Sequence, residues 1–323
     1  MSNLIGHEAA WAQWRAAIGG QRPHHAWLLA GREGLGKAAF ALAAAAELVA
    51  EPGVPQPPPH QHPDILRLEP LPANEDEAKK RDDGRPWQRK RNISVDQVRE
   101  MQRRLVTRPT LGRRRAVIFD ASDQLEKGAV NALLKSLEEP PQGTFFLLVA
   151  HQPGRLLPTV RSRCQVLRFH ALNDADLALA LDRSGQPMDA ATRTAALAVG
   201  AGSPGAALAF AAHELGTVFG LMQRLAREGD PEFALRGALS TALAGKLDRE
   251  RQAAIIEAAR MVLVRALDSA DRNAAAQIVE AHARIVTLAG QAPIFNFDPA
   301  LMLLEIGALL ASVGRTRENA NRA

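Results

Sequence analysis

The fold is decided by the stretch AWLLAGREGLGKAAFALAAAAEL, residues 26–48. A short apolar run leads into a glycine-rich turn, and alanine-rich sequence that favours helix follows Lys37. Strand, turn and helix in this order are the context in which G-x-x-x-x-G-K-[ST] cradles phosphate groups. Gly31, Gly36 and Lys37 fit this pattern, with Gly34 between them, but Ala38 stands where a hydroxyl would hold Mg²⁺.

The rest of residues 1–170 alternates between strand and helix patterns. Two helices are predicted, one over 93–105 with a capping box at Ser94 and Gln97, and one over 127–139 that ends before two prolines. This alternation predicts a parallel α/β sheet with flanking helices. The further strands are predicted in DILRL (64–68), RRRAVIFD (113–120), TFFLLVA (144–150) and QVLRF (165–169).

The pattern changes after Ala171. Residues 174–323 show helical periodicity broken by glycine and proline, without a convincing strand. We predict a small helical module over 171–212 and a larger all-α module over 213–323.

The composition limits the class of protein. Of 323 residues, 46% are hydrophobic and 4% aromatic, so the core must rest largely on alanine and leucine. The net charge of +5 is compatible with nearby nucleic acid without indicating it. One cysteine, Cys164, excludes an intrachain disulfide and a thiolate zinc cluster. Without the features of a signal peptide or a membrane span, we expect a cytoplasmic protein.

A second element of nucleotide chemistry lies at the end of a predicted strand. Asp120 closes the run AVIF, where an ATPase of this layout holds Mg²⁺ through an aspartate. Ala121 follows it, where an active enzyme of this layout would carry the glutamate that activates water. Alanine therefore replaces both the hydroxyl that would bind Mg²⁺ and the glutamate that would activate water, which suggests disuse of the site.

Residues 131–164 resemble the bacterial clamp-loader subunits of the AAA+ family. The resemblance rests on NALLKSLEEPP followed about twenty residues later by RSRC, with the phosphate loop, HPDI (62–65) and AGSPGAAL (201–208) in support. It implies an AAA+ module over 1–170, a lid over 171–212 and a collar that oligomerises over 213–323. It also implies tau/gamma and delta subunits as partners, and work on a sliding clamp and primed DNA.

The positions at which this chain differs from the family pattern indicate which member of the family it resembles. The tau/gamma motor has a Ser or Thr, a Glu and a lid Arg where this chain has Ala38, Ala121 and Gly205. The resemblance is therefore to the non-hydrolysing stator subunit, and an active ATPase such as the tau/gamma motor is the alternative. We expect no required cofactor and at most weak, vestigial binding of nucleotide or phosphate at residues 34–37.

The family often carries a four-cysteine zinc module after the helix of the phosphate loop. This chain has LVAEPGVPQPPPHQHPD there, without cysteine, and His60 and His62 are too few to replace it. We therefore expect no zinc and interpret the two histidines as loop residues.

In the family, the arginine of the Ser-Arg-Cys motif reaches ATP held by a neighbouring subunit. The resemblance implies this role of arginine finger for Arg163, between Ser162 and Cys164. The alternative is an ordinary surface cation. A second basic feature, the tract of residues 79–91, is compatible with contacts to DNA phosphates, but its interleaved acids favour a solvated surface insertion.

Overall fold

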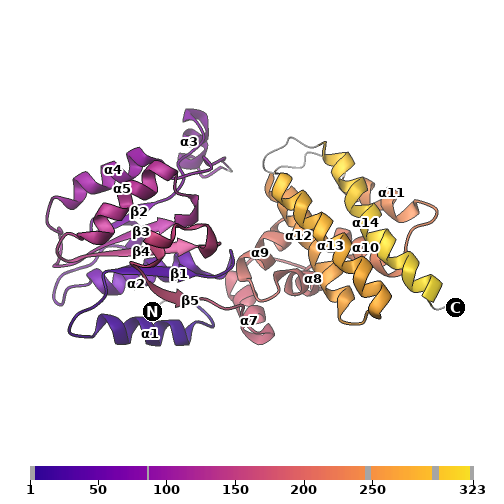
Figure 1. Cartoon of the computed structure of the whole chain (residues 1–323), viewed down its shortest axis with the longest axis horizontal. Helices are drawn as coiled ribbons and strands as arrows, with labels where there is room; N and C mark the ends of the chain where they lie inside the picture. Colours follow the sequence, from indigo (N-terminus) through magenta and orange to yellow (C-terminus); the bar gives the residue numbers. More distant parts are fainter. Residues whose placement is uncertain (1–3, 86, 244–248, 293–297, 321–323) are drawn as a thin grey trace. The chain divides into compact units, whose positions relative to one another are not determined.

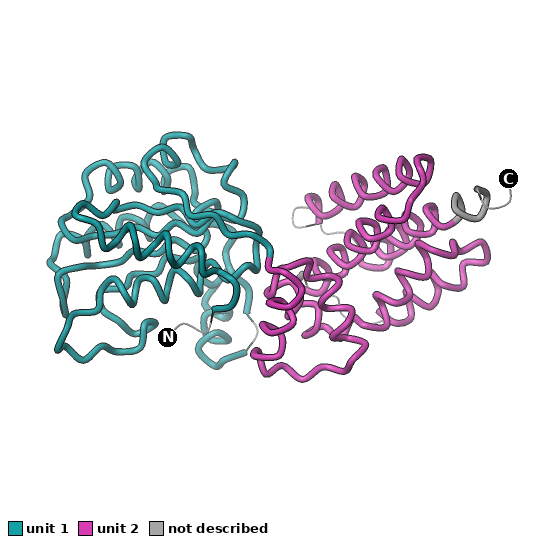
Figure 2. The backbone as a smooth tube through the Cα atoms, turned by 90° about the horizontal axis from the view of Figure 1, so that it is seen from below, with its two compact units in different colours: residues 1–171 teal, residues 172–323 magenta. Residues whose placement is uncertain are grey.

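The computed structural model describes residues 4–85, 87–243, 249–292 and 298–320 (Figure 1). The chain folds into two compact units, Met1–Ala171 and Leu172–Ala323 (Figure 2). In the described part of the chain, every strand belongs to the first unit.

A five-stranded parallel sheet forms the centre of the first unit, with the strand order β2-β3-β4-β1-β5. All five strands lie within the runs that the sequence predicts, and the parallel sheet is confirmed. The inner strand β4 is buried along its whole length, which is why it reads as a continuous apolar run. The strands are β1 (Ala26–Ala30), β2 (Ile65–Leu68), β3 (Arg115–Asp120), β4 (Thr144–Ala150) and β5 (Gln165–Arg168).

Helices cover both faces of this sheet (Figure 1). The helices α1 (Glu8–Ile18) and α2 (Lys37–Val49) pack on one face, and α4 (Val95–Leu105) and α5 (Lys127–Glu138) pack on the other. Successive strand residues point to opposite faces, so Leu29 packs with the first pair and Leu28 with the second. The result is a three-layer α/β unit.

Helix α4 begins where its capping box predicts. The backbone N–H of Gln97 donates to Oγ of Ser94 at 3.4 Å, and the N–H of Ser94 donates to Oε1 of Gln97 at 3.1 Å. Two orphan donors of the first turn are thereby satisfied, which fixes the start of the helix. Helix α1 has no such cap, and sequence analysis did not predict it.

The charged segment 73–92, predicted as a surface insertion, contains a helix that the sequence analysis did not predict. Helix α3 (Glu75–Asp82) begins after Asn74, whose Oδ1 accepts from the N–H of Glu77 at 2.9 Å. Its first turn is acidic and its last turn is basic, an order that suits the helix dipole. Short elements complete the unit: α6 (Pro158–Arg161) and the 3₁₀ turns Pro59–Gln61, Ser122–Gln124 and Pro153–Arg155.

The second unit is helical throughout its described residues, as predicted. Glycines with positive φ follow α7 and α10, at Gly185 and Gly229, and Gly185 has the left-handed conformation of a helix cap. The helices are α7 (Asp174–Ser184), α8 (Ala190–Gly200), α9 (Pro204–Ala212), α10 (Gly216–Glu228), α11 (Ala234–Ala242), α12 (Arg249–Leu267), α13 (Arg272–Gln291) and α14 (Pro299–Ala320). One apolar core runs from Leu172 to Val313 through these helices. The division at residue 212 into lid and collar stays a prediction.

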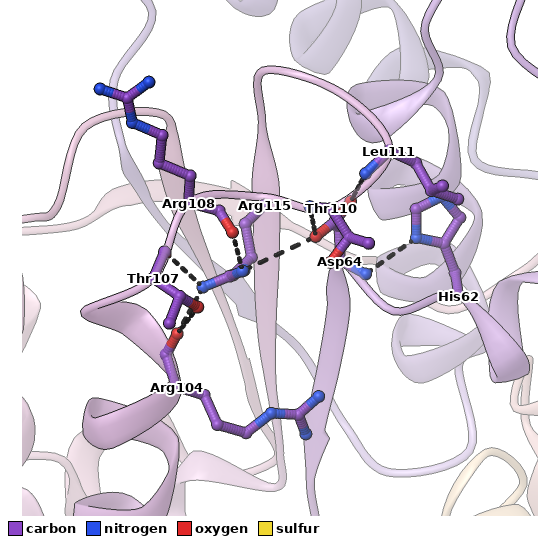
Figure 3. A network of polar contacts seen from close by, with 8 residues as sticks. All are labelled: His62, Asp64, Arg104, Thr107, Arg108, Thr110, Leu111 and Arg115. Carbon is purple, nitrogen blue, oxygen red and sulfur yellow. Dashed lines mark hydrogen bonds and ion pairs between the residues drawn. The ribbon is translucent and has the colours of Figure 1, made fainter.

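A buried ion pair ties the loop between α4 and β3 to the edge of the sheet (Figure 3). Asp64 and Arg115 are 0% and 5% exposed, and Nη2 of Arg115 lies 3.7 Å from Oδ1 of Asp64. Asp64 also accepts from the N–H groups of Thr110 at 2.7 Å and Leu111 at 2.8 Å. Arg115 donates to three carbonyls of the same loop: Arg104 at 2.7 Å, Thr107 at 3.1 Å and Arg108 at 2.9 Å.

His62 belongs to the same network. Its Nδ1 accepts from the N–H of Asp64 at 3.0 Å, and its Nε2 lies 2.7 Å from Oε1 of Gln56. The side chain is buried, so this histidine orders the proline-rich segment in front of β2. His62 and Asp64 of HPDI therefore have a structural role in this chain.

Replacing Asp64 with alanine should lower the free energy of unfolding of the first unit by roughly 3–5 kcal/mol, because Arg115 would stay buried without its carboxylate. All four tryptophans lie in the first unit, at positions 11, 14, 27 and 87, so denaturant unfolding followed by tryptophan fluorescence reports on it alone. The matched control is Glu47→Ala, which breaks the exposed pair with Arg15 and should cost at most about 1 kcal/mol. Similar losses for both variants would contradict the assignment.

Candidate functional site

The glycine-rich turn joins β1 to α2 at the edge of the sheet where all parallel strands end. Gly34 and Gly36 have φ values of 78° and 81°, and Gly36 is the residue before the first turn of α2. Lys37 opens the helix. The predicted strand, loop and helix are all present, so the backbone N–H groups at residues 34–37 lie at a helix N-terminus, where anions are stabilised.

The glycines of this turn have different physical reasons. A Cβ on Gly31 would lie 2.5 Å from the carbonyl oxygen of Phe169, so the backbone beyond β5 approaches too closely for any side chain. A Cβ on Gly36 would meet only the side chain of Leu4, at 3.8 Å, so this position needs glycine for its positive φ. Packing and backbone conformation therefore account for both glycines without a phosphate.

Lys37 is turned back onto its own loop. Its Nζ donates to the carbonyl oxygen of Arg32 at 2.5 Å, and the residue is 2% exposed. Burial lowers the pKa of Lys37 to about 8, against the opposing influence of Glu33, Asp123 and Asp120. The ammonium group is thus a structural donor whose charged form is destabilised by burial.

The segment before α1 covers the loop from outside. The side chain of His7 is buried, and its Nε2 donates to the carbonyl oxygen of Leu35 at 2.7 Å. The ring of His7 meets that of Phe169 edge-on, with centroids 4.8 Å apart. Sequence analysis missed this contribution, because a single histidine near the start of a chain carries no spacing signal.

Two positions that an ATPase of this layout uses, one to hold Mg²⁺ and one to activate water, carry alanine here. Ala38 has only a methyl group in the first turn of α2. Ala121 directly follows the last residue of β3 and is 2% exposed. Asp120 is present, but Oδ2 of its carboxylate lies 2.8 Å from Nη2 of Arg67 on β2. The predicted carboxylate therefore has a guanidinium as its charge partner. Arg67 was not predicted from the sequence.

Asp123, two residues further on, is also engaged. Its carboxylate accepts from the backbone N–H of His151 at 3.2 Å and of Gln152 at 2.9 Å. Oγ of Ser122 donates to the carbonyl oxygen of Val149 at 2.8 Å. These bonds tie the turn after β3 to the end of β4, so Asp123 orders the edge of the sheet.

Arg163 lies in a turn directly after α6, between β4 and β5, as predicted. Its Nη1 donates to the carbonyl oxygen of Thr159 at 2.9 Å, and its Nη2 lies 2.6 Å from Oε1 of Glu138 at the end of α5. The side chain is 35% exposed. The segment is a helical turn rather than an extended strand, so Arg161 and Arg163 do not lie on opposite sides of a strand.

Burial raises the pKa of the Cys164 thiol to about 12, which makes it an inert packing residue.

The predicted lid motif forms the start of α9 in the second unit. Ser203 is buried, and its side chain accepts from the N–H of Ala206 at 3.3 Å as the N-cap. Gly205 follows Pro204 in the first turn and presents no side chain to a nucleotide. The motif therefore still forms the start of a helix, but Gly205 stands where the tau/gamma motor has an arginine.

The basic tract is largely neutralised by neighbouring acids. At least four of its cations pair with carboxylates: Lys80 with Glu77 at 2.6 Å, Arg81 with Asp82 at 2.8 Å, Arg85 with Asp83, and Arg89 with Glu69 at 3.3 Å. Arg89 also lies over the ring of Trp87, with Cζ 4.9 Å from the ring centroid. These contacts support the interpretation of the tract as a solvated surface insertion. Contact with DNA stays untested.

Two further features concern the described residues only. No group of three or more His, Cys, Asp or Glu side chains is arranged there to hold a metal ion. No single helix in the same ranges is long and apolar enough to cross a membrane, although α9 and α10, bent by 105°, would pass such a test as a pair.

Known proteins resemble the chain in sequence. The DNA polymerase III subunit delta′ of Pseudomonas aeruginosa is 38% identical over 169 residues, which are 49% of this chain and 45% of that protein. The subunit delta′ of Escherichia coli is 41% identical over 124 residues, which are 38% of this chain and 37% of that protein. The matches thus span less than half the length of these curated relatives.

A solved structure resembles the whole chain in fold. It is a DNA polymerase III gamma subunit-related protein from Thermotoga maritima, 18% identical, with a TM-score of 0.51 over 95% of this chain and 99% of that one. The family model described as "DNA polymerase III, delta subunit" matches residues 6–173, more than half of the chain. The chain therefore belongs to this family of DNA polymerase III subunits, and its delta′ relatives agree with that membership.

Proposed function

We propose that this chain is a non-hydrolysing delta′ subunit of a bacterial clamp loader, which helps to place a sliding clamp on primed DNA. It presents Arg163 to ATP bound by a neighbouring motor subunit. Membership of the DNA polymerase III family supports the setting. The observation that carries the proposal is the partly exposed guanidinium of Arg163, held outside a phosphate loop that lacks the hydroxyl by which such a loop binds Mg²⁺.

Arginine suits this role for physical reasons. A guanidinium is always charged at physiological pH and presents a planar fork of donors to phosphate oxygens. The side chain of Arg163 is 35% exposed, and its described contacts are with α5 and α6 rather than with the phosphate loop. A phosphate on another subunit is therefore the more suitable partner than one in its own loop.

The alternative function is that of an active AAA+ ATPase such as the tau/gamma motor. A relative with that name, from Mycobacterium bovis, is 28% identical over 207 residues. Ala38, Ala121 and Gly205 argue against this function, because each replaces a side chain that an active site of this layout uses. The engagement of Asp120 by Arg67 adds a fourth argument.

The rest of the proposal concerns partners and setting. Tau/gamma and delta subunits are the proposed direct partners, and the clamp and primed DNA are reached through the complex in the cytoplasm. No zinc and no required cofactor enter the proposal, and the phosphate loop is given at most weak binding of phosphate or nucleotide.

The isolated chain should not hydrolyse ATP, because neither Ala38 nor Ala121 supplies the oxygen that Mg²⁺ or the attacking water needs. Phosphate release is measured with the purified full chain, and Lys37→Ala serves as the comparison that removes the remaining phosphate ligand. Turnover that is present in the natural chain and absent in Lys37→Ala would favour the motor alternative.

Arg163→Ala should leave fold and assembly intact and lower the clamp- and DNA-stimulated ATPase of the reconstituted loader. An arginine finger contributes about 10³–10⁵ in rate at its own site, but the total loss should be partial, because other interfaces have their own fingers. Arg163→Lys should rescue poorly, since an ammonium group lacks the planar fork.

Arg161→Ala is the matched control for Arg163, because it removes an exposed guanidinium two residues away in the same turn. It should keep the ATPase of the loader at the level of the natural chain. Equal rates for Arg163→Ala and the natural chain, in complexes of equal assembly, would mean that this subunit has only an architectural role.

The region 213–323 should provide the main assembly surface. Helices α13 and α14 expose apolar side chains, among them Val286 at 48% and Leu301 at 66%. Because 172–212 shares its core with this region, substitutions test the surface better than truncation does. Val286→Glu combined with Leu301→Glu should reduce co-purification with tau/gamma and delta by roughly tenfold or more, as expected when charges enter an apolar contact.

The control for the assembly surface is Leu179→Glu, at a leucine of α7 that is 41% exposed and lies outside 213–323. It adds one glutamate to the same unit, half the charge of the double variant, and should assemble normally. Unchanged co-purification of the α13–α14 double variant would move the main assembly surface elsewhere.

A further inference from the structure

The ion pair between Arg67 and Asp120 joins neighbouring strands at the edge where the phosphate loop lies. In the parallel register Arg67 is opposite Ile118, so Asp120 lies two residues further on and on the same face of the sheet. The arginine side chain spans this offset and brings Nη2 to 2.8 Å from the carboxylate. The side chain of Asp120 is 13% exposed, so the pair is half shielded from water.

A second acid, Glu69, also holds Arg67 in place. Its Nη2 also lies 3.2 Å from Glu69, and Glu69 in turn lies 3.3 Å from Nη1 of Arg89. The guanidinium therefore bridges two carboxylates and does not depend on Asp120 alone for its position. Because Glu69 also binds the guanidinium, Arg67 stays near Asp120 even when the phosphate loop changes conformation.

The charges around the phosphate loop show why a cation is needed there. Lys37 lies within the electrostatic influence of Glu33, Asp120 and Asp123, so three carboxylates gather around one buried ammonium group. In an ATPase of this layout the aspartate at the end of β3 is balanced by Mg²⁺ and its phosphate ligands. Here the guanidinium of Arg67 balances Asp120 from within the chain.

We infer that Arg67 is an internal counter-ion that takes the place of a divalent cation at Asp120. The chain then has two independent obstacles to Mg²⁺, the missing hydroxyl at Ala38 and the cation of Arg67. Any phosphate group that the loop takes binds through backbone N–H groups and Lys37, without help from a divalent cation. The inference concerns the loop on which the proposed function rests, but it involves neither Arg163 nor assembly.

The consequence is that restoring the hydroxyl alone does not restore the metal site. In Ala38→Thr the new oxygen faces a carboxylate that is still neutralised, so Mg²⁺ gains little. In the double variant Ala38→Thr, Arg67→Ala, both a hydroxyl and an unpaired carboxylate are present, as oxygen-seeking Mg²⁺ requires. Only this variant should bind ADP more tightly with Mg²⁺ than with a chelator, by roughly tenfold or more.

The experiment is calorimetric titration of ADP into the full chain, with Mg²⁺ or with a chelator, for the natural chain, both single variants and the double variant. Ala38→Thr combined with Arg67→Lys keeps a cation at the site and should behave like Ala38→Thr alone. Ala38→Thr combined with Arg89→Ala removes a guanidinium from Glu69 without touching Asp120, and is the matched control.

A second measurement does not depend on nucleotide binding. In Arg67→Ala the thermal midpoint of the first unit, followed by tryptophan fluorescence, should rise when millimolar Mg²⁺ is added, because the cation then finds an unpaired Asp120. The natural chain and Arg89→Ala should show no such rise.

Two outcomes would overturn the inference. One is Mg²⁺-dependent ADP binding in the natural chain or in Ala38→Thr alone, since Arg67 would then be no obstacle. The other is a combined result. The double variant folds but binds ADP equally well with and without Mg²⁺, and the thermal midpoint of Arg67→Ala does not change when Mg²⁺ is added. Failure of the proposed function would look different, because it appears as ATP turnover by the natural chain or as full activity of a loader that carries Arg163→Ala.

Discussion

The common direction of the five strands is the constraint on which the rest of the first unit depends. In a parallel sheet every strand ends at the same edge, so segments that are far apart in sequence deliver their turns to one place. The turn after β1 brings the glycines and Lys37, the end of β3 brings Asp120, and the end of β4 brings the backbone donors that hold Asp123. An ATPase of this layout uses the same edge, and in this chain two of the positions there, Ala38 and Ala121, carry alanine.

The phosphate-loop motif is recognisable in this chain because Gly31, Gly36 and Lys37 each have a structural role. Gly31 leaves room for the backbone at Phe169, Gly36 supplies a positive φ, and Lys37 closes the turn by binding the carbonyl of Arg32. Ala38 continues a helix in which alanine is the most favourable residue, and Ala121 is buried without a polar group to satisfy. A recognisable phosphate loop is therefore weak support for nucleotide binding, since folding alone retains it.

Much of this was predictable from sequence, and the reasons differ from element to element. The strands and α4 were predicted because burial on both faces and a capping box leave local patterns in the chain. Helix α1 was missed because no cap marks it, and α3 was hidden by its charge, although its acids precede its cations. Arg67 could not be found, because its role arises only when β2 and β3 lie side by side in register.

The pairing of Arg163 with Glu138 bears on how an arginine could serve a neighbour. Both side chains are well exposed, at 35% and 51%, and such a pair contributes only about 0–1 kcal/mol in water. The bond to the carbonyl of Thr159 restricts the guanidinium further without burying it. The side chain is thus held near one position at little energetic cost to release. A phosphate, with more charge than a carboxylate and a geometry that suits the same fork, would displace Glu138 without disturbing the core behind it.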